Sequence, residues 1–306
     1  MKITCFYRIF LLNLLFISLN SYAVGDTTSV EKNDSWKFKF SAEISSQVYY
    51  DTRQVLSARE DELLFYPLPV VMDSEGNDLN AQPSLNMLAI TSRLGLKIQS
   101  PDVLGAKTTG FLEADFSGST NSGINMFRLR HAYVNMEWRT SELLVGQYWT
   151  PLVLPEIMPG TRPLNMGVPF HPYSRYVQAR FLQHIGDFEL IGVAAFQLDN
   201  KSSGPDGMNT QYLRHSCIPE LTLQLRYNTD RVFVGAAYNL LVLQPRAFVV
   251  DSLSNTYKTN TKFASHAFSV FGKYNFNKWA IKMQSVLGDN MDAHLLMGGY
   301  AESPLD

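Results

Sequence analysis

The chain has 306 residues, of which 45% are apolar and 18% are charged, and its formal net charge is −2. This length and apolar content are enough for one large all-β domain or two smaller domains, and they exclude an intrinsically disordered chain. The slightly acidic balance gives no indication that the chain binds nucleic acid or an anionic surface.

The first 23 residues have the layout of a secretory signal peptide. Lys2 and Arg8 precede or flank the start of an apolar run over residues 9–19, and Ser21-Tyr22-Ala23 is a small-residue cleavage site. Cleavage after Ala23 leaves 24 basic and 28 acidic residues, and therefore a mature net charge of −4. Residues 24–35 are polar, and we expect them to form a flexible N-terminal arm.

Residues 36–50 alternate between apolar and polar side chains, with Ser46 as the one break in the apolar row. A strand sorts such residues onto two faces, whereas a helix scatters them around its axis. Strands in soluble proteins typically have about 5–6 residues, while a tilted strand that crosses a bilayer needs roughly 9–11. Aromatic residues at both ends of the segment stand where interfacial girdles lie in membrane barrels. On this segment alone, an ordinary long sheet strand and a membrane-spanning strand fit equally well.

The same alternation recurs along the chain and predicts an all-β, antiparallel transmembrane β-barrel over residues 36–306. Besides 36–50, we predict spanning strands at 86–98, 108–116, 125–138, 142–149, 173–184, 187–198, 218–228, 231–242, 263–275 and 279–287, which makes eleven, and a twelfth that begins at His294. Short turns near residues 101, 140, 185, 229 and 277 alternate with longer loops, as the periplasmic turns and extracellular loops of such barrels do.

This parity requires residues 51–84 to be a single extracellular loop, which carries a short hairpin around residues 63–68. After residue 23 no window holds eighteen consecutive apolar residues, so a membrane location requires a closed barrel. The chain ends at 303–306 in polar residues without a terminal strand. Because an open barrel exposes an unpaired edge, we expect the sequence to be an incomplete gene product that lacks its closing strands.

Several segments resemble the porins of Gram-negative outer membranes, and most closely the DcaP-like trimeric porins and their relatives in Bacteroidetes. The segments are Phe127-Arg128-Leu129-Arg130-His131-Ala132-Tyr133-Val134, Val145-Gly146-Gln147-Tyr148-Trp149, Tyr50-Asp51-Thr52-Arg53-Gln54, Asn86-Met87-Leu88-Ala89, Leu112-Glu113-Ala114-Asp115-Phe116 and Met297-Gly298-Gly299-Tyr300. The resemblance implies a sixteen-stranded barrel, a homotrimer in outer-membrane lipid and lipopolysaccharide, and the passage of small anionic solutes. About twelve of those strands are present here, so this chain ends roughly a quarter earlier.

If the apolar row of each strand faces lipid, the polar row faces a water-filled lumen. The basic residues of that row are Lys37, Lys39, Arg93, Lys97, Arg128, Arg130, Arg180, Arg226, Lys273 and Lys282, and its acidic residues are Glu43, Glu113, Asp115, Glu189 and Glu220. An excess of fixed positive charge in a pore attracts anions. The sequence therefore predicts a passive channel for small, carboxylate-type anions, although the whole chain is net negative.

Arg128 and Arg130 are two residues apart on one strand, so their guanidinium groups share a face and together fit one carboxylate or phosphate. The alternative is that both arginines pair with Glu113 and Asp115 on the neighbouring strand and only solvate the wall. Within the same strand the alternation slips, and a β-bulge near His131 would reconcile its two halves.

The proline-rich segment 150–172 does not alternate and is not a strand. It either folds inward and narrows the pore, with Arg162 and His171 as constriction residues, or forms an ordinary extracellular loop. We expect no catalytic or metal site and no cofactor, because the six histidines lack metal-ligand spacing and neither Gly-x-Ser-x-Gly nor His-Glu-x-x-His occurs. Two alternatives to a porin stay open. One is an outer-membrane enzyme or adhesin anchored by its barrel, and the other is a soluble glycan-binding β-sandwich with short strands buried on two faces.

Overall fold

The computed structural model describes residues 36–118, 120–158 and 168–300. The predicted signal peptide, the N-terminal arm, Arg162 and the last six residues lie outside these ranges.

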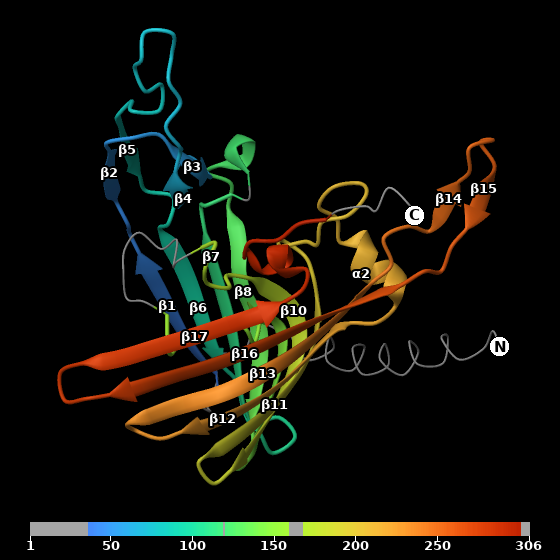
Figure 1. Ribbon diagram of the computed structural model, residues 1–306. Helices are drawn as coiled ribbons and strands as arrows, with labels where there is room; N and C mark the ends of the chain where they lie inside the picture. The colour runs from blue at the N-terminus through green and yellow to red at the C-terminus, as the bar shows by residue number, and fades with distance from the viewer. Residues whose placement is uncertain (1–35, 119, 159–167, 301–306) are drawn as a thin grey trace, which may run out of the picture. The chain divides into compact units, whose positions relative to one another are not determined.

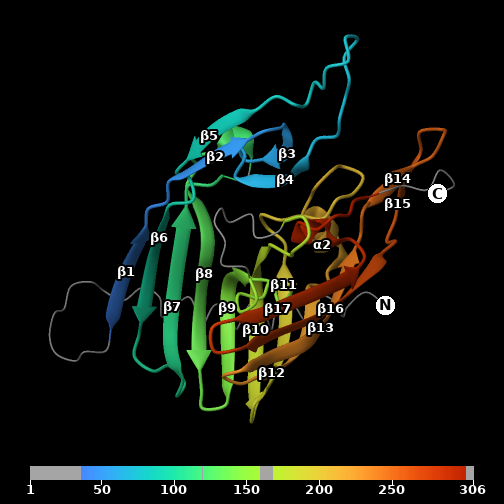
Figure 2. The same ribbon diagram turned by 60° about the vertical axis from the view of Figure 1, so that its left-hand side comes forward.

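Eleven strands form one antiparallel sheet in the order β1-β6-β7-β8-β9-β10-β11-β12-β13-β16-β17 (Figures 1 and 2). They are β1 (Lys37–Glu43), β6 (Arg93–Gln99), β7 (Lys107–Asp115), β8 (Arg128–Glu137), β9 (Ser141–Trp149), β10 (Arg175–Ile185), β11 (Phe188–Phe196), β12 (Glu220–Asn228), β13 (Val232–Leu243), β16 (Phe263–Asn275) and β17 (Ala280–Gly288). Each of the eleven predicted spanning strands contributes one strand to this sheet, although two of them are shorter than predicted. The antiparallel pairing of successive strands is that of an up-and-down barrel. Within the described residues the sheet does not close, and β1 and β17 are its two edges.

The short turns all lie at one end of the sheet, here called the turn end, and the long connections lie at the other, here called the loop end. Residues 51–84 form one connection at the loop end, as predicted, and the hairpin expected inside it is β3 (Val55–Ala58) paired with β4 (Leu63–Pro67). A second small hairpin, β14 (Phe248–Val250) with β15 (Thr256–Lys258), projects from the connection between β13 and β16 (Figure 1). In the part of the chain that the structure describes, the helical elements are η1 (Asn121–Gly123), α2 (Gln211–Ser216) and η2 (Met291–His294).

Two predicted strands are each broken into two. The segment 36–50 divides into β1 and β2 (Gln47–Asp51), and 86–98 divides into β5 (Ser84–Leu88) and β6; β2 and β5 pair with each other in a separate small sheet. At the break the Ser92 hydroxyl accepts a hydrogen bond from the Ser45 amide at 3.0 Å, and Gln47 Nε2 donates to Thr91 Oγ1 at 2.8 Å. Hydrogen bonds made by side chains thus replace the ladder at this level.

The predicted twelfth strand is wrong, because the chain forms η2 and then irregular structure where that strand should begin. Asn290 and Leu295, on either side of η2, have positive φ angles of 56° and 60°, which turn the chain away from an extended path. His294 is fully buried rather than placed on a strand.

The two faces of the sheet differ in a way that a soluble protein does not show. On the outer face the apolar row is exposed, as at Phe268 (57%) and Val270 (59%) of β16. On the inner face the polar row is buried, as at Thr222 and Gln224 of β12. Polar residues inside and apolar residues outside are the inverse of globular burial and the pattern of a transmembrane barrel. Among the described residues, no helix has the length and apolar character that crossing a bilayer demands.

Candidate functional site

The inner face carries its basic residues in two groups, and a bulge in β8 organises the group at the loop end. The register between β7 and β8 shifts so that Glu113 faces His131 while Ala114 faces Leu129, which leaves Arg130 as the extra residue. This confirms the bulge predicted near His131. Because a bulge changes which face the following side chains occupy, Arg128, Arg130 and His131 are all buried together.

Carboxylates on β7 occupy the guanidinium groups of Arg128 and Arg130. Arg128 donates from Nε and Nη2 to Asp115 Oδ1 and Oδ2 at 3.1 and 2.8 Å. Arg130 donates from Nη1 to Asp115 Oδ2 at 2.9 Å and from Nε to Glu113 Oε1 at 2.7 Å. The interpretation in which the two arginines pair with the neighbouring strand therefore describes this geometry, and the two forks are not free to grip a solute together.

Arg175, at the first position of β10, completes the loop-end group and was not predicted. Its guanidinium carbon lies 4.7 Å from the centre of the Trp149 ring and 5.5 Å from that of Tyr173. The same Trp149 ring lies 5.9 Å from the guanidinium carbon of Arg130. Arg175 shares its sequence row with Val177 and Phe181, which are exposed on the outer face, so alternation assigned it to lipid. A charge on an apolar row was the signal that sequence reasoning passed over.

The second basic group lies nearer the turn end, around Arg180 and Arg226. Arg180 donates to the Trp149 carbonyl at 2.8 Å and stacks on Tyr148, while Arg226 Nη1 lies 3.5 Å from Glu156 Oε1 and 3.7 Å from Glu189 Oε2. Both arginines line a hollow of about 600 Å³ on the inner face. Its lining also includes Lys97, Lys107, Glu137, Glu142, Phe111 and Tyr133.

Four more of the predicted cations lie on the edge strand β1 and on its neighbour β6. Lys37 and Lys39 of β1 are exposed, and Lys39 faces Lys97 of β6 directly across the pair. Arg93 faces Glu43 in the same register, and its Nε is buried without a hydrogen-bond partner among the described residues. Lys273 of β16 and Lys282 of β17 face each other across their pair, and Lys282 Nζ donates to the Met158 carbonyl at 2.8 Å. The ten predicted basic residues thus form no single cluster.

The described beginning of the segment 150–172 lies on the inner face of the sheet. This is the position expected if the segment folds inward. Gln224 Nε2 donates to the Pro151 carbonyl at 3.1 Å and Gln284 Nε2 to the Leu152 carbonyl at 2.9 Å. Leu154 and Ile157 then pack on Phe233 and Phe271, which are inward residues of β13 and β16. The inner wall is therefore apolar where this segment covers it.

His171 belongs to the far end of the same segment. Its Nδ1 lies 2.8 Å from the Pro172 carbonyl, and burial lowers the pKa of its imidazole. It therefore adds little positive charge at neutral pH, whatever its place in the pore.

A second covering element, η2, is held by a buried polar network. Ser174 Oγ lies 2.8 Å from His294 Nδ1 and from Thr150 Oγ1, and His294 Nε2 lies 3.1 Å from Glu220 Oε1. A serine, a histidine and a glutamate in a row have the composition of a hydrolase triad. All three are at most 2% exposed, and the serine hydroxyl is already bonded to Thr150, so a substrate carbonyl cannot reach it. The network fixes η2 to the ends of β10 and β12.

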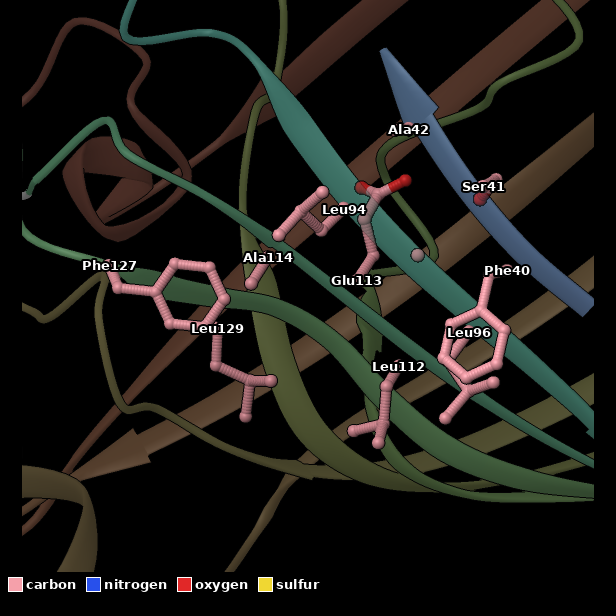
Figure 3. A pocket seen from close by; sticks show the side chains of 11 residues that line it. Phe40, Ser41, Ala42, Leu94, Leu96, Leu112, Glu113, Ala114, Phe127 and Leu129 are labelled. Carbon is pink, nitrogen blue, oxygen red and sulfur yellow. The ribbon is translucent and has the colours of Figure 1, made fainter.

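The outer face has its own shallow groove of about 610 Å³, shown in Figure 3. Its labelled lining is mostly apolar and comes from neighbouring strands, with Phe40 of β1, Leu94 and Leu96 of β6, Leu112 of β7 and Leu129 of β8. A lining of this kind suits lipid chains and not a polar ligand. Within the described ranges, no group of three or more His, Cys, Asp or Glu side chains is placed to hold a metal ion.

Residues 13–286 match the model of a family described as DcaP outer membrane protein. The crystal structure of the outer membrane channel DcaP of Acinetobacter baumannii aligns with a TM-score of 0.58 at 17% identity, over 85% of this chain and 66% of that one. The trimer form of in-vitro folded OmpT, an outer membrane protein of Vibrio cholerae, aligns with a TM-score of 0.50 at 11% identity, over 84% and 66%.

A search of curated proteins gives no match. At these identities the two structures establish a shared fold and not a shared solute. This chain spans 66% of the length of each, just under two thirds.

Proposed function

We propose that this chain, which belongs to the DcaP outer membrane protein family, builds a water-filled channel in the bacterial outer membrane through which small, carboxylate-type anions diffuse passively. The observation that carries the proposal is the inverted burial of the sheet, with an apolar outer face and a polar inner face.

The inverted burial favours a membrane channel over a soluble sandwich. A sandwich that binds glycans would bury its apolar row between two sheets. Here the exposed row runs across strands far apart in the sheet, from Phe40 on β1 through Leu112 on β7 and Leu223 on β12 to Met283 on β17. A contiguous apolar surface of this extent is stable in lipid and aggregates in water.

The charges on the inner face support a preference for anions. Arg128 and Arg130 are balanced by Asp115 and Glu113, and Arg226 lies near Glu156 and Glu189. Among the described residues no carboxylate pairs within 4 Å with Lys39, Lys97, Arg175 or Arg180. Unbalanced fixed cations on a pore wall lower the energy of an anion in the lumen and raise that of a cation.

The predicted partners follow from the same proposal. The apolar outer face contacts outer-membrane lipid and lipopolysaccharide, and the chain assembles as a homotrimer. The similar OmpT structure of Vibrio cholerae, which is a trimer form, supports this assembly. Export depends on a signal peptide cleaved after Ala23. An outer-membrane enzyme or adhesin that uses its barrel only as an anchor remains the competing proposal.

Reconstitution of the detergent-refolded chain into planar bilayers tests the function. Under a KCl gradient we expect discrete conductance steps and a reversal potential on the chloride side of zero. Because Lys39 and Lys97 face each other at the exposed edge, the double variant Lys39→Glu, Lys97→Glu should move the reversal potential towards potassium. Replacing the exposed turn residues Arg231 and Lys278 with Glu makes the same change of charge and is the matched control.

Silence in the bilayer, together with intact folded protein, would remove the channel proposal and leave the anchored enzyme or adhesin. Conductance with a cation preference would leave the channel and remove the anion preference. Monodisperse, folded protein in detergent-free buffer would favour the soluble sandwich.

A further inference from the structure

We propose that the loop end of the inner face holds a binding site for one small oxyanion, a carboxylate or a phosphate group, with the Arg175 guanidinium as its principal ligand. The site deepens the proposed function and rests on it for access, since the anion reaches Arg175 from the lumen. It differs from the predicted clamp of Arg128 and Arg130, whose guanidinium groups are already occupied.

Arg175 is buried, and part of its hydrogen-bonding capacity is unused. Only 4% of the residue is exposed, and its Nε and Nη1 atoms are buried without a hydrogen-bond partner among the described residues. Buried polar groups in folded proteins are nearly always hydrogen-bonded, so each unpaired group calls for an explanation. The N–H groups of a guanidinium form a planar fork that binds a carboxylate or phosphate in a bidentate way.

The surroundings hold the guanidinium in place, but no carboxylate among them neutralises it. The Trp149 ring lies 4.7 Å from its carbon, and a ring face attracts a cation without accepting its N–H groups. The Tyr173 ring lies 5.5 Å away, and its hydroxyl is a hydrogen-bond partner of the guanidinium but leaves Nε and Nη1 unpaired. Two carboxylates of this region, Asp115 and Glu113, are paired with Arg128 and Arg130. Arg175 is therefore the one guanidinium of the loop-end group whose charge no described carboxylate balances.

Arg93 provides a further donor on the same side, and His131 provides a further unpaired ring nitrogen. The His131 ring lies 5.3 Å from the Trp149 ring, and its Nδ1 is buried with no partner in the described part of the chain. The Arg93 Nε is unpartnered in the same sense. An anion at Arg175 therefore enters a region with unpaired guanidinium N–H groups and positive charge, which favours small oxyanions over neutral solutes.

The Trp149 ring gives the site its own optical signal. We expect the intrinsic fluorescence of the refolded chain in detergent to change saturably with inorganic phosphate, and likewise with acetate, at constant ionic strength set by chloride. Trp149→Phe removes this change and identifies its source, because Trp36, Trp138 and Trp279 lie elsewhere in the sequence. Arg175→Gln should weaken phosphate binding at least tenfold.

Arg231→Gln is the matched control, since it makes the same change of charge at an exposed turn and should leave phosphate binding unchanged. Arg175→Lys keeps the charge but not the planar pair of donors, so it should bind phosphate less well than the wild type and better than Arg175→Gln. If Arg175→Gln does not fold, the lysine variant and the wild-type titration carry the test.

A wild-type titration without saturation would overturn the site, and so would Arg175 variants that bind phosphate like the wild type. Because the measurement needs no bilayer, its failure is distinguishable from that of the channel. Phosphate binding without conductance keeps the site and removes the pore, while anion-selective conductance without saturable binding does the reverse.

Discussion

Asp115 is the shared partner of Arg128 and Arg130, and its removal should strongly destabilise the sheet. Its carboxylate accepts three hydrogen bonds from Arg128 and Arg130 and lies 3.3 Å from the Ser117 amide, and only 1% of the residue is exposed. Breaking a buried ion pair by removing one partner typically costs about 3–5 kcal/mol, because the other charge is left buried and unpaired. We therefore expect Asp115→Asn to lower the free energy of unfolding by about 3–5 kcal/mol.

The structure supplies a graded control for this prediction. Glu113 accepts one bond from Arg130 and is more exposed, so Glu113→Gln should cost less than about 2 kcal/mol. The double variant Asp115→Asn, Arg128→Gln also removes the arginine charge that Asp115→Asn leaves unpaired. It should recover part of the lost free energy of unfolding, and a double-mutant cycle measures this recovery. Urea unfolding in detergent, followed by far-UV circular dichroism, measures all three. A loss below about 1 kcal/mol for Asp115→Asn would refute the reasoning, because the pair would then be solvated rather than buried.

Three further predictions concern other parts of the molecule. Leu154→Ala should destabilise the fold by about 2–5 kcal/mol and raise single-channel conductance, because it empties the contact that holds the inward segment on the wall. Val270→Arg should lower the free energy of unfolding in bilayers by about 2–4 kcal/mol, since it puts a charge on the outer face. Val249→Arg in the β14–β15 hairpin should leave that free energy nearly unchanged. Equal effects of the two variants in a urea titration would argue against a lipid-facing surface. Hydrogen bonds from the Asn255 side chain and amide lower the pKa of Asp251. These bonds should therefore stabilise the β14–β15 hairpin above the usual pKa of an aspartate, about 3.9, and should be lost only as the pH falls below that value. Limited proteolysis at pH 3 and pH 7 checks this, and the Asp251→Asn variant should show no such pH dependence.

Much of the sheet could be predicted from the sequence because a barrel strand needs a strict two-residue period to keep lipid and water apart. Even the bulge was predictable, since the period slips once, next to His131. The breaks in the first two predicted strands were not. They depend on hydrogen bonds between Ser45 and Ser92, and between Gln47 and Thr91, which are 47 and 44 residues apart. Alternation carries no information about bonds of that range.

The inner face was predicted less well, because there the two-residue period competes with tertiary packing. Phe233 and Phe271 are on the inward row, where the pattern of a simple channel requires polar residues. They are apolar because the segment after β9 folds onto them and forms a small core inside the barrel wall. The proline content of that segment predicted the absence of a strand. Predicting that the segment folds inward would have required the observation that β13 and β16 carry apolar residues on both rows.

Net charge is a poor guide to what this inner face attracts. The whole chain is net negative, but many of its acidic residues lie in turns and loops, and acidic residues of the wall are paired with arginines. The field that a solute meets in the lumen comes from the charges within about 8 Å of it at physiological salt, because more distant exposed charges are screened. Around Arg175 and Arg180 those nearby charges include guanidinium groups without carboxylate partners among the described residues. A protein with a negative net charge can therefore have a positive potential in its lumen. Ion selectivity has to be argued from the pairing of each charged wall residue rather than from the net charge of the chain.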